Sequence, residues 1–450
     1  MKLNQTHLVL RAATPADIDA LVAFTADVLR HQDADEPDAR TGAWTRDLLE
    51  GVHPRVRCSD FTVVEDARTG RIVSSAGLIS QTWTYAGLPI EVGQLELIGT
   101  EPAYRGRGLV RAQIERLHDW SAARGQRVVA IDGIPWFYRQ FGYEMALELR
   151  GEISIDASMI LAAAEGEARP VRIRQAVERD FPFLTRVYQA ASARTLVSCE
   201  RGGPEWRLEL GRRETSFYRL ELRVIESAAG EPCGFLAHAP QLAGGTLGVV
   251  QYELDAGAAW AAVTPDVLRH LRTVGRAYAE RRGEADVYRL GLCLGTEHPA
   301  YELVPPFAPR DEGAYAWYLR VADLPSLIQH LVPVLERRLA ASAAAGHSGT
   351  LLISFYRDGL RLDLDRGRIV AVSAWRPALD LPGVERNQPT RAARAAASFP
   401  GLAFLQLLFG YRSFDELRHA FADCIVRTPE AYDLLTALFP KQPSNVWAVM

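Results

Sequence analysis

The feature that most constrains the fold is an internal repeat, in which matched residues return after a constant offset of 163 positions, as Arg174 follows Arg11. The matched positions are Leu10, Arg11, Ala13, Asp17, Ile18 and Leu21 in the first half and Ile173, Arg174, Ala176, Asp180, Phe181 and Leu184 in the second. A single short match carries little weight, so the order of the elements around it decides whether the chain contains a duplication.

Strand and helix signals follow the same order in both halves. The first half predicts strands at 7–11, 60–66, 71–83 and 88–100, a helix at 109–124 and a strand at 127–131. The second half predicts strands at 218–226, 233–238 and 247–254, a helix at 265–282 and a strand at 286–293. Matched residues and matched element order together predict a tandem duplication of one domain, joined near residues 161–168.

A third region with a different order of elements begins near residue 322. A predicted helix at 324–339 precedes strands at 351–356, 360–364 and 368–374, and apolar helical segments follow at 402–409, 414–421 and 431–439. Strands followed by helices indicate an α+β unit. The sequence therefore predicts a mixed α/β protein of the α+β class with three domains, at residues 1–160, 161–321 and 322–450.

Composition excludes several functional classes. The 51 basic and 55 acidic side chains leave a net charge of -4, which gives no support for nucleic-acid binding. No segment approaches the ~20 apolar residues of a membrane helix, and the first residues lack the apolar stretch expected of a signal peptide. The five cysteines are scattered and the histidines show no metal-ligand spacing. We expect a cytoplasmic protein that binds no metal and neither nucleic acid nor membrane.

The most informative segment is LELIGTEPAYRGRGLV at residues 95–110, where a predicted strand leads through a glycine loop into a helix. Gly106 and Gly108 let the backbone approach a ligand, and a helix start offers unpaired amides with a positive dipole. Arg105, Arg107 and Arg111 add charge suited to phosphate. The alternative is a solvated arginine-rich loop, but the strand-loop-helix context favours an anion site.

This segment resembles the acetyl-CoA-binding motif of the GNAT acetyltransferase superfamily, Arg/Gln-x-x-Gly-x-Gly/Ala. Arg105 and Gly108 match, Val110 replaces the last small residue, and residues 100–104 match the usual approach to the motif. A second family feature, Tyr-x-x-x-Gly-Phe/Tyr, is similar to WFYRQFGY at residues 136–143. The two features together indicate a GNAT domain.

The layout of the whole chain narrows the resemblance to the Eis (enhanced intracellular survival) type, which has two tandem GNAT domains and a sterol-carrier-protein-type domain. The resemblance covers essentially the whole chain, and that type tolerates a bulky residue at the position of Val110. Residues 255–260, DAGAAW, stand where the phosphate loop of a second active copy would be. We therefore expect one active and one degenerate copy. Family members assemble as hexamers, so a homo-oligomer is implied.

The resemblance implies acetyl-CoA as co-substrate and assigns residues to it. Backbone groups of Ile98, Gly99 and Thr100 would hold the pantetheine arm and thioester, the loop amides would hold the pyrophosphate, and Gly133 and Ile134 match further cofactor contacts. The expected acetyl-CoA-binding residues are Ile98, Gly99, Thr100, Arg105, Gly106, Arg107, Gly108, Leu109, Val110, Arg111, Gly133 and Ile134.

Two catalytic groups follow from the same resemblance. Tyr138 matches the general acid that protonates the departing CoA thiolate, although its aromatic neighbours allow a packing role instead. Enzymes of this type use their C-terminal carboxylate as base, which here belongs to Met450 after an apolar tail. A frayed terminus is the alternative, and Glu96 is the second candidate for the base.

The expected activity is acetyl transfer from acetyl-CoA to a primary amine of an aminoglycoside-like molecule, a polyamine or a lysine-containing acceptor. The acidic segment HQDADEPD at residues 31–38, near Trp44, would suit a cationic amine, or it is an ordinary solvated loop. The alternative function is a non-catalytic acyl-CoA- or lipid-binding carrier, with apolar residues 402–409 lining a cavity.

Overall fold

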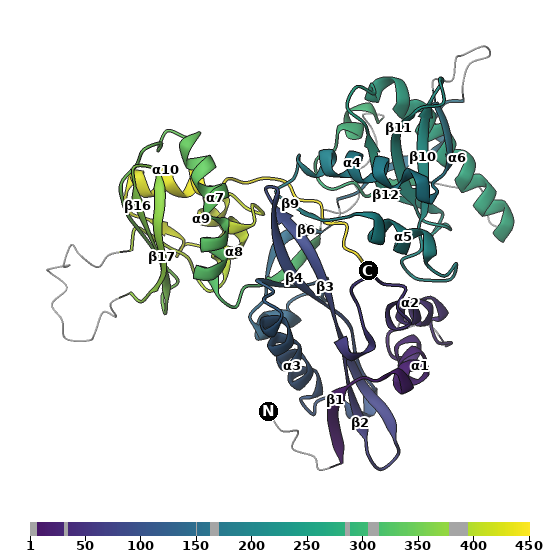
Figure 1. Ribbon diagram of the computed structural model, residues 1–450, viewed down its shortest axis with the longest axis horizontal. Helices are drawn as coiled ribbons and strands as arrows, with labels where there is room; N and C mark the ends of the chain where they lie inside the picture. The colour runs from purple at the N-terminus through teal and green to yellow at the C-terminus, as the bar shows by residue number, and fades with distance from the viewer. Residues whose placement is uncertain are drawn as a thin grey trace.

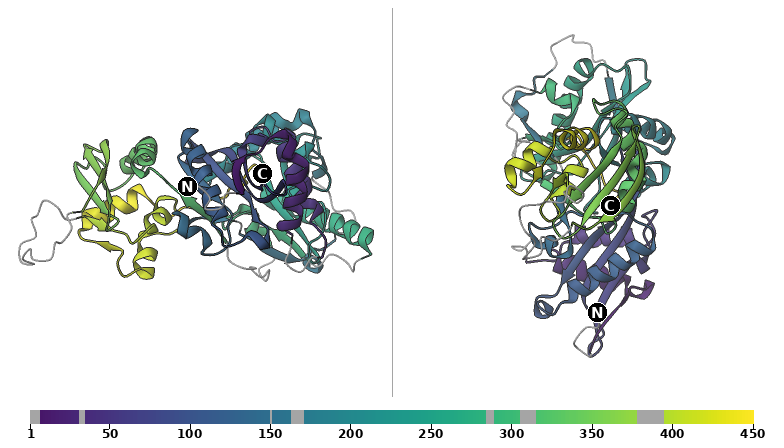
Figure 2. Two further views of the ribbon diagram at one scale, coloured as in Figure 1. Left: turned by 90° about the horizontal axis from the view of Figure 1, so that it is seen from below. Right: turned by 90° about the vertical axis from the view of Figure 1, so that its left-hand side faces the viewer.

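A computed structural model describes residues 7–30, 35–149, 151–162, 171–283, 289–304, 315–377 and 395–450. Its three sheets lie in three lobes, coloured purple to blue, teal, and green to yellow in Figure 1. The first two lobes lie against each other, and the left view of Figure 2 shows the third lobe beside the first, away from the second. None of the described helices has the length and apolar character needed to cross a membrane.

The first sheet has the strand order β1-β2-β3-β4-β5-β14-β6, with β9 paired to β3. Its strands are β1 (Leu8–Ala12), β2 (Phe61–Asp66), β3 (Arg71–Tyr85), β4 (Leu88–Thr100), β5 (Val128–Ile131), β6 (Glu144–Leu149), β9 (Val197–Cys199) and β14 (Tyr315–Arg320). The lobe's helices are α1 (Ile18–Val28), α2 (Ala39–Leu49) and α3 (Leu109–Ala123). Because side chains alternate along a strand, Leu78 joins a core with Ile114 of α3, whereas Ile79 joins the core that contains Phe24 of α1.

The second sheet has the order β7-β13-β12-β11-β10-β8. Its strands are β7 (Ile153–Asp156), β8 (Val171–Gln175), β10 (Glu221–Ser227), β11 (Pro232–His238), β12 (Thr246–Leu254) and β13 (Arg289–Leu292). The lobe's helices are α4 (Phe181–Ser192), α5 (Gly203–Gly211) and α6 (Trp260–Arg282). In both sheets four antiparallel strands precede one parallel pair, β4–β5 in the first and β12–β13 in the second.

The sequence repeat also preserves side-chain contacts. Arg11 pairs with Asp17 at 2.7 Å and with Glu65 at 2.8 Å. In the second lobe Arg174 pairs with Asp180 at 2.7 Å and with a carboxylate of the neighbouring strand at 2.5 Å. Each arginine thus ties the first strand of its sheet to the next strand and to the start of the first helix.

The first two lobes exchange one strand each across the expected boundary at residue 160. β14, which follows the second copy, pairs with β5 through Tyr318 and Ile131, and β7, which follows the first copy, pairs with β13. Each exchanged strand takes the position beside the last parallel strand of the other sheet. Sequence patterns did not indicate this exchange, because strand pairing is a tertiary property.

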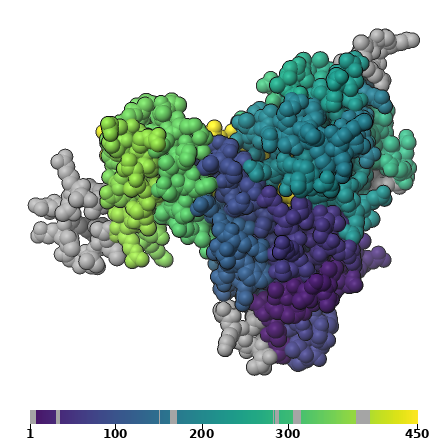
Figure 3. All heavy atoms as spheres, in the orientation of Figure 1, coloured from purple at the N-terminus to yellow at the C-terminus, as the bar shows by residue number. Residues whose placement is uncertain are grey.

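The described part of the third lobe combines a sheet of order β17-β16-β15-β18-β19 with four helices. The elements are α7 (Leu324–Ala340), β15 (Gly349–Ser354), β16 (Gly359–Asp365), β17 (Arg368–Trp375), β18 (Ala397–Ser398), α8 (Ala403–Leu408), α9 (Phe414–Ala420), β19 (Ile425–Val426) and α10 (Pro429–Leu438). Its core includes Phe399, Phe404 and Phe439. After α10 the chain crosses to the first two lobes, where only small yellow parts of it are visible in Figure 3.

Candidate active site

An opening forms where β4 and β5 separate. The two strands pair in parallel from Val92 to Gln94 of β4, and no β4–β5 pair follows among the described residues, although β4 continues to Thr100. An irregularity in the register between β3 and β4 coincides with Leu97, whose φ of 52° is unusual for a residue with a branched side chain. The residues from Ile98 to Thr100 therefore line an opening between the strands rather than a β5 ladder.

The glycine loop connects this strand to α3. Gly106 and Gly108 have φ values of 73° and 77°, which an L-residue with a side chain adopts only at a cost. Gly108 is the N-cap of α3, and it has no side chain that could cap the first amides of the helix. Backbone amides and the positive end of the helix dipole thus favour an anion here.

Three arginines surround the loop. Arg105 donates to the carbonyl oxygen of Thr100 at 3.3 Å, and Arg107 lies over the ring of Tyr104 at 4.9 Å. Arg111 donates to the Gln140 side-chain oxygen at 2.9 Å. These contacts orient three guanidinium groups around the start of α3, where they suit the oxygens of a diphosphate.

A cavity of about 630 Å³, the loop cavity, joins the strand opening to the glycine loop. All the residues expected to bind acetyl-CoA line it except Gly133, and Tyr138 lines it as well. The full lining is Val28, Leu29, Ile98, Gly99, Thr100, Tyr104, Arg105, Gly106, Arg107, Gly108, Leu109, Val110, Arg111, Ile134, Phe137, Tyr138, Gln140 and Phe141. The structure therefore brings together the residues that the motif singled out.

Gly133 does not line this cavity but lies behind Tyr138, which does. A Cβ atom on Gly133 would lie 2.3 Å from the ring of Tyr138, so only glycine allows this ring to pack against the backbone. The hydroxyl of Tyr315, on the exchanged strand β14, donates to the carbonyl oxygen of Gly133 at 2.6 Å. The exchanged strand thereby holds the segment that precedes Tyr138.

Tyr138 is almost fully buried, with its ring centroid 5.8 Å from that of Tyr318. Burial raises the pKa of Tyr138 well above its usual range, and the nearby carboxylates of Glu96 and Asp132 raise it further. A phenol in this environment stays protonated at neutral pH, so it can donate a proton to a departing anion.

The C-terminal tail ends beside this site. The side-chain amide of Gln81 exchanges two hydrogen bonds of 3.2 Å with the backbone of Val449. The ring of His53 bonds the same carbonyl oxygen at 3.2 Å, and burial lowers the pKa of His53 to about 4. Met450 itself is buried, and the amide of Gln94 contacts its sulfur at 2.9 Å. The alternative prediction of a frayed C-terminus is therefore wrong.

Arg201 is the residue that sequence reasoning missed most clearly. Its guanidinium donates to the carbonyl oxygens of Trp447 and Ala448, both at 3.0 Å, and lies 3.5 Å from the centroid of the Trp447 ring. Glu209 accepts another bond from Arg201 at 2.9 Å. No local signal could have indicated this contact, because the partners are about 250 positions apart in the chain.

Glu96, the second candidate for the base, lies near the C-terminal residue Met450. Its carboxylate accepts a hydrogen bond from Gln94 at 2.7 Å, and Gln94 in turn contacts Met450. Glu96 also contributes to the raised pKa of Tyr138. The C-terminus, Glu96 and Tyr138 therefore belong to one neighbourhood.

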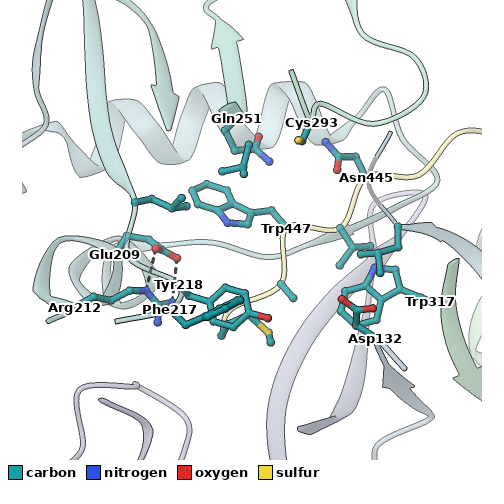
Figure 4. A pocket seen from close by; sticks show the side chains of 16 residues that line it. Asp132, Glu209, Arg212, Phe217, Tyr218, Gln251, Cys293, Trp317, Asn445 and Trp447 are labelled. Atoms are coloured by element: carbon teal, nitrogen blue, oxygen red, sulfur yellow. Dashed lines mark hydrogen bonds and ion pairs between the residues drawn. The ribbon is translucent and has the colours of Figure 1, made fainter. Parts of the chain in front are cut away.

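A second cavity of about 250 Å³, the tail cavity, lies between the first two lobes (Figure 4). It is lined by Asp132, Leu149, Glu209, Arg212, Phe217, Tyr218, Leu220, Val250, Gln251, Cys293, Trp317, Asn445, Val446, Trp447, Ala448 and Met450. Asp132 immediately precedes Gly133, which contacts the Tyr138 ring. The end of the tail cavity at Asp132 is therefore close to the loop cavity, which Tyr138 lines.

The acidic segment near Trp44 was expected to contact a cationic amine, but its described residues have structural roles. Residues 31–34 lie outside the described residues, and Asp38 caps α2 by accepting from the backbone amide of Arg40 at 3.0 Å. Trp44 is buried, with its ring 4.7 Å from that of Tyr218. Trp44 therefore supports one wall of the tail cavity from behind.

The second copy lacks the features of the phosphate loop. Where the first copy has Arg105, the second has Asp255, whose carboxylate pairs with Arg186 at 2.6 Å. A carboxylate before the start of α6 disfavours a phosphate there.

Comparison with known proteins agrees with this geometry. Residues 9–146 match the family model described as an acetyltransferase (GNAT) domain. Among curated protein sequences none matches the chain significantly.

Three solved structures resemble the chain over 98% of its length. A probable N-acyltransferase from Enterococcus faecalis V583 has a TM-score of 0.66 at 14% identity, with 99% of that chain covered. A GCN5-related N-acetyltransferase from Kribbella flavida has a TM-score of 0.64 at 17% sequence identity, with 97% of that chain covered. Eis1 from Mycobacterium abscessus has a TM-score of 0.61 at 16% sequence identity, with 99% of that chain covered. Residues 9–146 thus match an acetyltransferase (GNAT) domain, and the chain shares its fold over nearly its whole length with Eis1 from Mycobacterium abscessus.

Proposed function

We propose that the protein transfers the acetyl group of acetyl-CoA to a primary amine by direct attack on the thioester. The observation that carries this proposal is that Asp132, which lines the tail cavity, immediately precedes Gly133, whose backbone lies against the ring of Tyr138 in the loop cavity. The arginines and loop amides of the loop cavity suit the charge of acetyl-CoA, and the tail cavity would lead an acceptor toward its reactive end.

In the proposed reaction the amine nitrogen forms a bond to the thioester carbon, and the carbon–sulfur bond then breaks. Backbone groups of residues 98–100 would hold the thioester and stabilise the developing oxyanion. The amine proton would pass to the carboxylate of Met450, and Tyr138 would protonate the CoA thiolate. The buried, hydrogen-bonded tail supports Met450 over Glu96, because it holds the terminus in one position.

The acceptor would enter the tail cavity. The sequence leaves aminoglycoside-like amines, polyamines and lysine side chains as candidate classes. The three-domain division, the sterol-carrier-type third domain, the cytoplasmic location and the homo-oligomer stay predictions. The side chains of α8, offered as a lipid-cavity wall, are buried and include Phe404 and Leu407 of the main core, which favours a structural role for them.

The test is release of CoA thiol from acetyl-CoA with a panel of primary amines. Release that depends on an amine, together with the acetylated amine in the mass spectrum, supports the proposal. Binding of CoA without release for any amine would favour the carrier alternative instead.

A further inference from the structure

The segment that leads to Tyr138 contains a strained turn. The carbonyl oxygen of Pro135 accepts a hydrogen bond from the amide of Phe137 at 2.8 Å, which closes a γ-turn around Trp136. Trp136 has a φ of 67° and a ψ of -34°, a backbone conformation that a bulky aromatic residue rarely adopts. Its indole is 71% exposed, so packing of the side chain does not explain the turn. A contact from outside the segment is therefore needed to hold this conformation.

The exchanged strand β14 supplies the bonds that hold the turn. The amide of Trp136 donates to the hydroxyl oxygen of Tyr318 at 2.5 Å. Tyr318 is fully buried, and β14 pairs on one side with β5 and on the other with β6, so this hydroxyl has a fixed position. At the other end of the segment, the Tyr315 hydroxyl donates to the carbonyl oxygen of Gly133 at 2.6 Å. Two tyrosines of one strand thus fix both ends of the segment that precedes Tyr138.

The same strand also packs on the proposed acid itself. The ring centroids of Tyr318 and Tyr138 lie 5.8 Å apart, and both residues belong to the core beside α3. The preceding residue, Trp317, belongs to the other core of the first lobe and lines the tail cavity, where Figure 4 shows it beside Asp132. Because neighbouring side chains of a strand face opposite ways, β14 presents Tyr318 to the acid and Trp317 to the tail cavity.

The position of Tyr138 matters because a general acid has to lie within hydrogen-bond reach of the group that it protonates. A displacement of about 1 Å can lower a rate on the order of 100-fold. Tyr138 lies on a 3₁₀-helix of only five residues, Phe137–Phe141, which begins immediately after the strained turn. A change in the turn would therefore move Tyr138, whereas β4 and the glycine loop, which would hold acetyl-CoA, would stay in place.

We infer that Tyr318 is a positioning residue for the general acid, and that Tyr315 supports it in this role. The inference rests on the proposed acetyl transfer, in which Tyr138 protonates the CoA thiolate. Tyr318 lines neither the loop cavity nor the tail cavity, so it acts through Trp136 and Tyr138. The strand that follows the second copy thereby completes the active site of the first copy.

The experiment is a double-mutant cycle on kcat, measured as release of CoA thiol with an amine that the wild-type protein acetylates. We expect Tyr318→Phe to lower kcat about tenfold, because the Trp136 amide loses its acceptor and the turn relaxes. In a Tyr138→Phe background the same change should lower kcat less than about twofold, because the acid that Tyr318 positions is absent. The KM for acetyl-CoA should change less than about twofold in each variant, since the cofactor contacts are intact.

Tyr85→Phe is the matched control. Tyr85 is fully buried on β3, and its hydroxyl donates to the carbonyl oxygen of Leu408 at 2.7 Å, so this substitution also removes a buried hydroxyl bond. It should lower the melting temperature about as much as Tyr318→Phe does and leave kcat unchanged. Adding Tyr315→Phe to Tyr318→Phe should bring kcat close to that of Tyr138→Phe, because both ends of the segment then lose their anchors.

The outcomes separate this inference from the proposed function. A kcat of Tyr318→Phe that equals that of Tyr85→Phe would overturn the positioning role while leaving acetyl transfer intact. An undiminished loss in the Tyr138→Phe background would also overturn it, because Tyr318 would then act independently of the acid. No amine-dependent release of thiol by the wild-type protein would overturn the proposed function itself and this inference with it.

Discussion

The guanidinium of Arg201 lies 3.5 Å from the centroid of the Trp447 ring and donates to the carbonyl oxygen of the same residue at 3.0 Å. Arg201 follows β9 in the segment that joins the second lobe to the first sheet, and Trp447 belongs to the last residues of the chain. This contact holds the terminus of the third lobe's chain inside a site built by the other two.

Arg201→Met should destabilise the protein, because it removes a buried ion pair and two bonds to tail carbonyls. Breaking a buried pair on one side costs about 3–5 kcal/mol of unfolding free energy. Urea denaturation measures the change. Arg207→Met is the matched control, because its pair with Glu178 is exposed on both sides and contributes less than about 1 kcal/mol. Equal stability of the two variants would contradict the anchoring role.

Adding two glycines after Met450 should lower kcat about 100-fold, because the carboxylate leaves its place at the end of the tail. Melting temperature and acetyl-CoA affinity should stay close to those of the unextended protein. Glu96→Gln is the comparison. If kcat falls in Glu96→Gln and not in the extended protein, the base is Glu96 and not the terminal carboxylate.

Tyr138→Phe should also lower kcat about 100-fold, since the CoA thiolate loses its proton donor. Tyr143→Phe serves as the control, because Tyr143 lies in the same aromatic core, bonds His118 at 2.7 Å and does not line the cavity. The raised pKa of Tyr138 keeps this acid protonated, so its titration should not reduce kcat up to about pH 10. Full activity of Tyr138→Phe would remove Tyr138 from the mechanism.

Gly108→Ala should weaken CoA binding about tenfold or more. A left-handed conformation costs an alanine about 1–2 kcal/mol, so the loop would shift from the conformation that presents the α3 amides to an anion. Gly70→Ala, in the turn between β2 and β3 with φ of 68°, should lose similar stability but bind CoA normally. Calorimetric titration with CoA distinguishes the two, and equal CoA affinities would argue against the loop as the phosphate site.

Stability should fall as pH decreases from about 6.5 to about 4. Burial lowers the pKa of His53 from 6.5 to about 4, so in this range the unfolded chain binds a proton that the folded protein does not. The loss attributable to His53 is of order 3 kcal/mol, and it is complete below the folded pKa. Denaturation across this range should show a smaller slope for His53→Gln than for His330→Gln, the control on α7. Equal slopes would contradict the assignment to His53.

Local patterns predicted most of the regular structure. The strand at 88–100 is β4 (Leu88–Thr100), and the expected helix from 109 is α3 (Leu109–Ala123). The helix expected from residue 265 begins five residues earlier, at Trp260, and contains Pro265, although a proline beyond the first turn removes one backbone hydrogen bond of the helix.

Sequence alone determined the repeat, the glycine loop and most of the residues that line the loop cavity, because strands, turns and helix starts depend on neighbours within a few positions. It did not indicate Val28 and Leu29, which reach this cavity from the end of α1. Only the tertiary structure decided the exchange of β7 and β14, the position of the tail and the aromatic tail cavity. Arg201 meets Trp447, Asp132 adjoins the tail cavity and Tyr315 holds Gly133 through pairings between residues far apart in the chain, which depend on how the lobes pack and leave no periodicity in the sequence.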